Sequence, residues 1–104
     1  FCFMIIYNVT VNIEENAHTE WLNWMKTVHI PDVMATGYFL DHRMAKVLST
    51  QEDEVGHTYA IQYTCHSMAD LEEYQEKCSN PLQEAHGKRY EGKFVAFRTL
   101  LEVV

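Results

Sequence analysis

The sequence is short of basic residues and of long apolar runs, and each shortage excludes a class of protein. Eight Lys and Arg residues stand against 15 Asp and Glu, which gives a formal net charge of −7. Non-specific binding to nucleic acid or to anionic membranes needs an excess of Lys and Arg near phosphates, so we expect neither partner. No apolar run approaches the roughly 18 residues of a membrane span, and Phe1–Tyr7 lacks the basic start and cleavage site of a signal peptide.

Cysteine and histidine show no disulfide or metal pattern. The chain has three cysteines, Cys2, Cys65 and Cys78, and no pair with the CxxC spacing. An odd number without that spacing disfavours a disulfide framework, so we expect a reduced, cytoplasmic protein. The six histidines show no HxH, HxxH or HExxH spacing, and we expect no dedicated metal site and no cofactor.

The chain does contain enough apolar residues for one hydrophobic core. It has 104 residues, of which 47% are hydrophobic. Folding a chain of this length buries about two-thirds of the surface that the unfolded chain exposes. We therefore expect a single domain over residues 4–104. Met4 offers a natural start, which makes Phe1–Phe3 an N-terminal extension.

The hydrophobic pattern predicts four strands and an amphipathic first helix. Met4–Ile13 alternates apolar and polar residues with period two, the mark of a strand packed on one side. Further strands are predicted at Tyr38–Leu48, Thr58–Cys65 and Phe94–Val103. Asn16 is a candidate cap for the first helix, and Pro31 should end or kink that helix near His29. Gly37 should stop any helix that continues.

A second helical segment completes a known order of elements. Ser67 and Asp70 have the spacing of a helix-capping pair, and Asn80-Pro81 should break this helix and start another that ends near Gly92. The order β-α-β-β-α-β is that of the ferredoxin-like α+β fold, a four-stranded antiparallel sheet with helices on one face. The other face of the sheet must meet solvent, a ligand or a partner.

We predict the ligand-binding residues on this open sheet face. The more apolar alternate set of the last strand, which includes Phe97 and Leu101, is assigned to the helices, so Arg98 and Glu102 join the polar face. The predicted ligand-binding residues are Asn8, Thr10, Gln62, Thr64, Arg98 and Glu102. Arg98 would hold a carboxylate or enolate, and Glu102 would act as a base if it is desolvated. A merely solvated sheet face is the alternative.

Four segments resemble a small bacterial family of unknown function, domain-of-unknown-function family 4286. They are MIIYNVTVNI, EWLNWMK with VHIPDVMATG, YAIQY and the closing GKFVAFRTLLEVV, and the resemblance runs from Met4 to Val104. It implies a ferredoxin-like dimeric α/β barrel, in which two sheets pack face to face, and hence a homodimer. The family carries no established activity.

The wider dimeric α/β-barrel group includes monooxygenases, some of which degrade haem. That branch has an Asn on the first strand, a Trp on the second helix and a His near the end of that helix. The resemblance would assign these roles to Asn8 and to His86, a speculative haem ligand, but the chain has Tyr74 in place of the Trp. His86 lies in a polar, charged stretch, so we expect it to face solvent and to bind no haem.

Three functions stay open at this point, and no catalytic residue can be named. The first is a homodimeric domain that binds a small organic molecule in a cavity on the open sheet face. The second is a structural or regulatory dimerisation module without catalysis. The third is a monooxygenase-like or haem-binding enzyme. A cavity of about 300 Å³ or more on that face would favour the first over the second.

Overall fold

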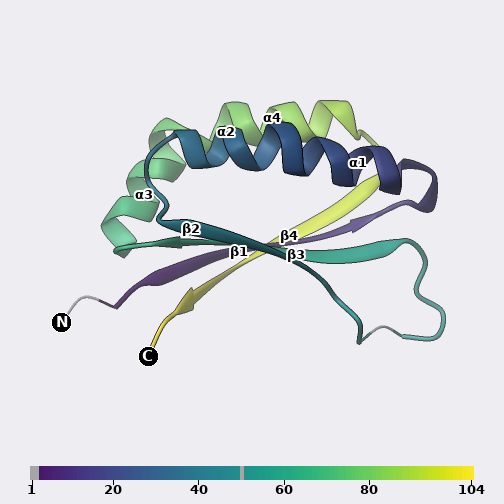
Figure 1. The fold of residues 1–104 in the computed structure, drawn as a ribbon, viewed down its shortest axis with the longest axis horizontal. Helices are drawn as coiled ribbons and strands as arrows, with labels where there is room; N and C mark the ends of the chain where they lie inside the picture. Colours follow the sequence, from purple (N-terminus) through teal and green to yellow (C-terminus); the bar gives the residue numbers. More distant parts are fainter. Residues whose placement is uncertain (1–2, 50) are drawn as a thin grey trace.

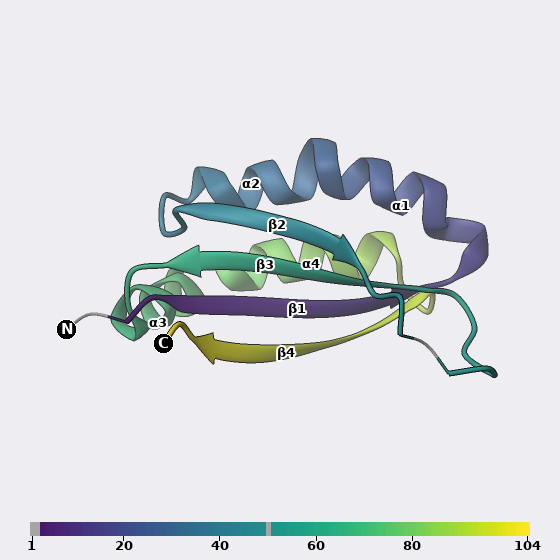
Figure 2. The same ribbon diagram turned by 60° about the horizontal axis from the view of Figure 1, so that its bottom comes forward.

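A computed structural model describes residues 3–49 and 51–104. Within these residues, four strands form one antiparallel sheet: β1 (Ile5–Ile13), β2 (Asp41–Lys46), β3 (His57–Cys65) and β4 (Phe94–Glu102). Their order across the sheet is β2-β3-β1-β4, which Figure 2 shows from the side of the strands. Of the extension predicted at residues 1–3, Phe1 and Cys2 lie outside the described residues.

The helices lie on one face of this sheet (Figure 1). The first helical segment consists of η1 (Glu15–Ala17), α1 (His18–Trp24), η2 (Met25–His29) and α2 (Ile30–Ala35). The second consists of α3 (Met68–Lys77) and α4 (Ser79–Arg89). This arrangement confirms the ferredoxin-like α+β fold. Among the described residues, no helix has both the length and the apolar character needed to cross a membrane.

The first helical segment becomes irregular where an end or a kink was predicted, near His29, and helix continues beyond it. A π-helical turn, η2, carries the chain into α2, where Pro31 occupies the first turn. Proline has no N–H to donate, and a wide π turn at this point keeps the helix continuous around the missing bond. The prediction that Asn16 caps the first helix is wrong, because Asn16 lies inside η1. The predicted stop is confirmed, since Gly37 follows the helix with a φ of +84°.

The second helical segment starts as its sequence predicts. Ser67 Oγ accepts a hydrogen bond of 3.2 Å from the backbone N–H of Asp70, which caps α3. The break falls at Cys78, slightly before the predicted Asn80-Pro81, and α4 then runs to Arg89. This second segment lies beside the first above the sheet, and the two form a single layer (Figure 1).

The hydrophobic core lies between the sheet and this helical layer. Its largest fully buried side chains are Trp21, Ile13, Ile61, Leu71, Val33 and Cys65. The helix-facing side chains of β1 and β3 alternate with polar ones, as the period-two pattern predicts.

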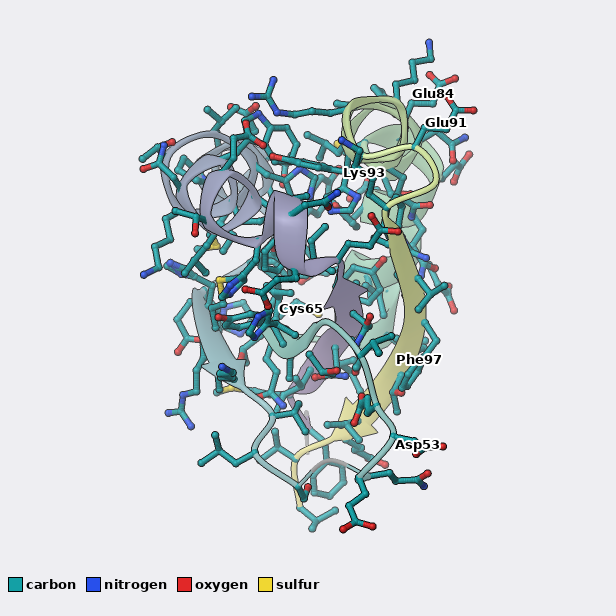
Figure 3. All side chains as sticks on the ribbon, turned by 90° about the vertical axis from the view of Figure 1, so that its right-hand side faces the viewer. Asp53, Cys65, Glu84, Glu91, Lys93 and Phe97 are labelled. Carbon is teal, nitrogen blue, oxygen red and sulfur yellow. The ribbon has the colours of Figure 1, made fainter. Side chains whose placement is uncertain are left out.

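The last strand presents the opposite face from the one predicted. In the antiparallel register, Arg98 pairs with Val9 and Glu102 pairs with Ile5, and cross-strand partners share one face of a sheet. Arg98 and Glu102 therefore lie on the helix side. The side chains on the open face are Val95, Phe97, Thr99, Leu101 and Val103. The prediction placed the more apolar face of β4 against the helices. In the structure that face is the exposed one, with Phe97 62% accessible. Figure 3 shows Phe97 at the outer surface of β4.

Candidate functional site

A cavity that brings together phenol, imidazole and guanidinium groups lies between the sheet and the helices, on the side opposite to the open sheet face. Its enclosed volume is about 70 Å³. Strands β1, β3 and β4 form the floor, and η2, α2, α3 and α4 form the roof. The lining includes these residues with polar side chains: Arg98, Tyr7, Tyr63, Tyr74, His86 and His29. Apolar side chains of Val9, Val11 and Ile61 lie between the polar groups.

Arg98 stands at the mouth of the cavity. Its side chain is exposed, and its Nε donates a hydrogen bond of 3.0 Å to the hydroxyl oxygen of Tyr7. Among the described residues, Arg98 makes no ion pair with a carboxylate. The two terminal nitrogens of the guanidinium therefore have no carboxylate partner and can bind an anion.

Three buried tyrosines gather beside Arg98. The ring centroids of Tyr63 and Tyr74 lie 6.3 and 6.1 Å from that of Tyr7. Burial is the largest cause that raises the pKa of both Tyr63 and Tyr74, so their hydroxyls stay protonated. Neither hydroxyl has a hydrogen-bond partner among the described residues. Among these residues, every solvent-inaccessible side-chain nitrogen or oxygen atom does have one. Both tyrosines line the cavity.

His86 is buried, which corrects the expectation that it faces solvent. It is 8% exposed, and its Nε2 accepts a hydrogen bond of 2.9 Å from Trp21 Nε1–H. Burial, followed by His29 and Arg98, lowers the pKa of His86 to about 4. The imidazole is neutral at pH 7, and its proton sits on Nδ1 because Nε2 is the acceptor. Nδ1–H has no hydrogen-bond partner among the described residues, and His86 is one of the residues that line the cavity.

A helical spacing in the sequence could have revealed this burial. Leu82, His86 and Tyr90 recur every four residues, and this spacing puts them on one face of α4. All three face inward, while the charged neighbours Lys88 and Arg89 are exposed. The charged neighbours determined the sequence-based interpretation, although they occupy the other side of the helix.

The cavity lining contains hydrogen-bond donors and no acidic residue. One guanidinium, three phenols and two imidazoles line it, without any Asp or Glu, in a chain whose net charge is −7. His29 lies at 5.7 Å from His86 between ring centroids, and burial lowers the pKa of His29 despite nearby Asp32. A site of this kind is complementary to an acceptor-rich or anionic molecule.

The predicted ligand-binding residues are divided between the two faces. Asn8, Thr10, Gln62 and Thr64 lie on the open face as predicted. Asn8 Nδ2 donates to Thr10 Oγ1 at 3.0 Å, so this amide already has a partner. Arg98 and Glu102 lie on the helix side of the sheet, so they cannot share a binding site with these four residues. Of these two, Arg98 lines the inner cavity, whereas Glu102 is exposed near the end of β4 and is not positioned to be a base there.

The open face carries two hollows of its own. One of about 630 Å³ lies between β4 and the loop 47–56 and includes Thr10 and Phe97. Figure 3 shows Asp53 of this loop at the opposite end of the view from the helices. The other, of about 160 Å³, includes Gln62 and Thr64. The larger exceeds the threshold of about 300 Å³ in the sequence analysis, but a loop and a sheet edge bound it, and it is wide open to solvent.

The residues do not fit haem. An enclosed volume of about 70 Å³ is far below that of pockets for much smaller ligands, and Trp21 already occupies the Nε2 of His86. Asn8 lies on the opposite face of the sheet from His86, so the two cannot share one ligand. In the described part of the chain, no group of three or more His, Cys, Asp or Glu side chains is arranged to hold a metal ion.

Solved structures with the same fold differ widely from this chain in sequence. A protein of the ethyl tert-butyl ether D (EthD) family from Bacillus halodurans has a TM-score of 0.71 at 8% identity, covering 96% of this chain and 99% of that chain. A dimeric ferredoxin-like protein from an uncultured marine organism has a TM-score of 0.70 at 14% identity, covering 97% and 94%. A protein proposed to be a monooxygenase, from Shewanella loihica, has a TM-score of 0.67 at 12% identity, covering 100% and 97%.

These similarities extend over nearly the whole chain and show the fold alone. No protein with a curated description matches this sequence. The family model for a domain of unknown function, DUF4286, matches residues 4–104. Because that match spans almost the full length, the chain belongs to the DUF4286 family of unknown function.

Proposed function

We propose that this chain is a homodimeric domain that binds a small anionic organic molecule in the cavity between its sheet and its helices. The observation that carries the proposal is the unpaired guanidinium of Arg98 at the mouth of a donor-rich cavity without acidic residues. A carboxylate or enolate would accept hydrogen bonds from Arg98, while an apolar tail would pack on Val9 and Val11 inside.

The size of the cavity limits the ligand. A dry protein cavity of about 150 Å³ holds benzene, with six ring atoms. The enclosed 70 Å³ found here is about half of that, so roughly three non-hydrogen atoms fit inside. The charged group of the ligand then stays at the mouth beside Arg98, where water still reaches it and the cost of desolvation is small.

Titration with pentanoate and with its uncharged amide, pentanamide, tests this proposal. Amide resonances of Val9, Ile61 and Ala96 should shift on adding pentanoate, because these residues line the cavity. The amide should bind about tenfold more weakly, since a charge-assisted hydrogen bond contributes about 1.5 kcal/mol or more. Arg98→Met should remove the preference for the acid, and Arg43→Met, on the exposed edge strand β2, should leave it unchanged. Equal binding of both compounds to the wild type and to Arg98→Met would contradict the proposal.

The homodimer is supported by an apolar surface on the open sheet face. The side chains of this β4 stripe are Val95, Phe97, Leu101 and Val103, and each of them is at least 40% exposed. Monomeric proteins rarely leave contiguous apolar strand surface of this kind uncovered. Two solved structures of the same fold are described as dimeric ferredoxin-like proteins. We infer that a second copy covers the β4 stripe through the same face.

The second candidate function, a dimerisation module without a ligand, rests on the same β4 stripe. It would need the stripe but no polar groups in the inner cavity. The buried tyrosines and His86 would then serve packing alone, and no carboxylate would bind in an Arg98-dependent way. The cytoplasmic location remains a prediction from the odd number of cysteines and the lack of a CxxC pair.

A further inference from the structure

Two of the polar groups of the inner cavity, the Arg98 guanidinium and the His86 ring, lie at different places along β4. Arg98 and its partner Tyr7 stand at one place, and His86 stands at the other, with its ring 4.4 Å from that of Phe94 between centroids. Arg98 and Phe94 are four residues apart on the strand, about 13 Å along its backbone. The long Arg98 side chain covers part of that distance. A molecule that reaches both places therefore has two polar ends on a short carbon chain.

The inner end offers a neutral donor with a fixed direction. Trp21 Nε1–H donates to His86 Nε2, so the proton of the neutral ring must sit on Nδ1. His86 lines the cavity and no described residue accepts from Nδ1–H, so this N–H is left for a ligand. Trp21 is itself fully buried, and the His86 ring also packs against Tyr90 and Phe94. These contacts hold the ring in place. A donor held in this way favours an uncharged acceptor, such as the oxygen of a ketone, over an aliphatic group.

The walls between the two polar ends are apolar. The apolar lining residues include Val9, Val11, Ile61, Val33 and Met25. None of them can pair with a polar group, so the middle of the ligand should be plain hydrocarbon. The enclosed volume, which admits roughly three non-hydrogen atoms, matches a terminal methyl ketone with its carbonyl oxygen.

We propose that the ligand is a short oxocarboxylate whose oxo group is remote from the carboxylate, and that His86 Nδ1–H is the group that recognises this oxo oxygen. The proposal rests on the proposed function, since Arg98 must bind the carboxylate at the mouth. Trp21 is a positioning residue, because it fixes which nitrogen of His86 carries the proton. The ligand enters between α4 and β4 with its ketone first.

Three five-carbon acids that differ in one oxygen test the proposal. They are pentanoate, 2-oxopentanoate and 4-oxopentanoate. The wild type should bind 4-oxopentanoate about tenfold more tightly than pentanoate, the gain expected for one well-placed neutral hydrogen bond. The 2-oxo isomer should show no gain that depends on His86, because its oxygen stays beside the carboxylate. Equal affinity for pentanoate and 4-oxopentanoate in the wild type would overturn the role of His86.

Two variants separate this proposal from the one on which it rests. Arg98→Met should weaken all three acids alike, whereas the double variant Trp21→Phe with His86→Phe should remove only the gain of 4-oxopentanoate. The double change leaves no buried donor or acceptor unpaired, which favours folding. If no acid binds the wild type, the proposed function itself fails. If pentanoate and 4-oxopentanoate keep a tenfold ratio in the double variant, the proposed function stands and the inference fails.

Imidazole nitrogen resonances give an independent test, and those of the wild type alone are enough to contradict the proposal. The free protein should show His86 with its proton on Nδ1, and 4-oxopentanoate should shift that Nδ1 signal while pentanoate leaves it in place. Trp21→Phe should yield a mixture of the two neutral tautomers and reduce the 4-oxo gain. A proton on Nε2 in the free wild type, or an Nδ1 signal that 4-oxopentanoate does not move, would contradict the proposal.

Discussion

The proton of His86 sits on Nδ1 because Trp21 donates to Nε2, and this one bond decides what the residue can do. The acceptor nitrogen is already used, so His86 offers a donor to the cavity and no free base. Burial keeps the ring neutral at pH 7, since a charged imidazole would lose its water without gaining a carboxylate partner. At the residue scale, His86 is therefore suited to a hydrogen-bond acceptor and not to the role of a base.

Lowering the pH should destabilise the protein through His86. The pKa is about 4 in the folded state and 6.5 in the unfolded state, so below pH 6.5 the unfolded chain takes up a proton that the folded chain does not. The free energy of unfolding should fall by about 2 kcal/mol between pH 7 and pH 5. Burial lowers the pKa of His29 as well, which acts in the same direction.

Urea denaturation at a series of pH values measures this loss. The Trp21→Phe with His86→Phe variant should lose most of the pH dependence. A variant of an exposed histidine on β2, His42→Gln, should keep it. A wild-type protein as stable at pH 5 as at pH 7 would mean that His86 is charged, or solvated, in the folded state.

At the scale of elements, the loop between β2 and β3 meets the end of β1 at a glycine. Gly56 has a φ of +79°, and a Cβ at this position would lie 2.6 Å from the backbone oxygen of Ile13 and 2.8 Å from Asn12 Oδ1. Asn12 Nδ2 also donates to the backbone oxygen of Val55 and to Thr58 Oγ1, both at 3.0 Å. This close approach holds the loop against β1 where β3 begins.

Gly56→Ala should destabilise the protein more than Gly37→Ala. Both glycines have a positive φ, but a Cβ at Gly37 would meet nothing within 4 Å. The backbone cost of an alanine at Gly37 is about 1 kcal/mol, while the clash at Gly56 raises the loss to about 3 kcal/mol. Thermal or urea unfolding of both variants compares them directly. Equal losses would show that the loop moves away from β1 without cost.

The elements also show how far sequence patterns reach. Period-two alternation predicted β1 and β3 well, because the helices of the same chain bury one side of each strand. It failed for β4, whose apolar side lies on the open face and whose helix side carries Arg98. Only the register with β1 assigns the faces of β4. The inner cavity was missed for the same reason, since it combines Arg98 with His86, which local charge had placed in solvent.

At the scale of the whole molecule, the two faces of the sheet differ in what they need. The helix face is closed by the first and second helical segments, apart from the mouth beside Arg98. The open face leaves the β4 stripe exposed, with Phe97 near its middle. An exposed aromatic side chain in an apolar patch is a typical anchor of a protein interface.

Phe97→Lys should therefore weaken the homodimer. A charge at a buried interface position should cost about 2 kcal/mol or more, which is roughly a thirtyfold rise in the dissociation constant. Light scattering at micromolar concentration should show a dimer for the wild type and a shift to monomer for Phe97→Lys. Val28→Lys, on an exposed position of the helical layer, is the matched control and should stay dimeric. A wild type that is monomeric at these concentrations would contradict the face-to-face arrangement.

The most direct measurement of the central claim is a crystal structure of the protein soaked with 4-oxopentanoate. Our account predicts one molecule per chain between α4 and β4, with its carboxylate on Arg98 and its chain against Val9 and Val11. It also predicts an empty open face around Gln62 and Thr64. A ligand found on that open face, with the inner cavity unchanged, would contradict the account.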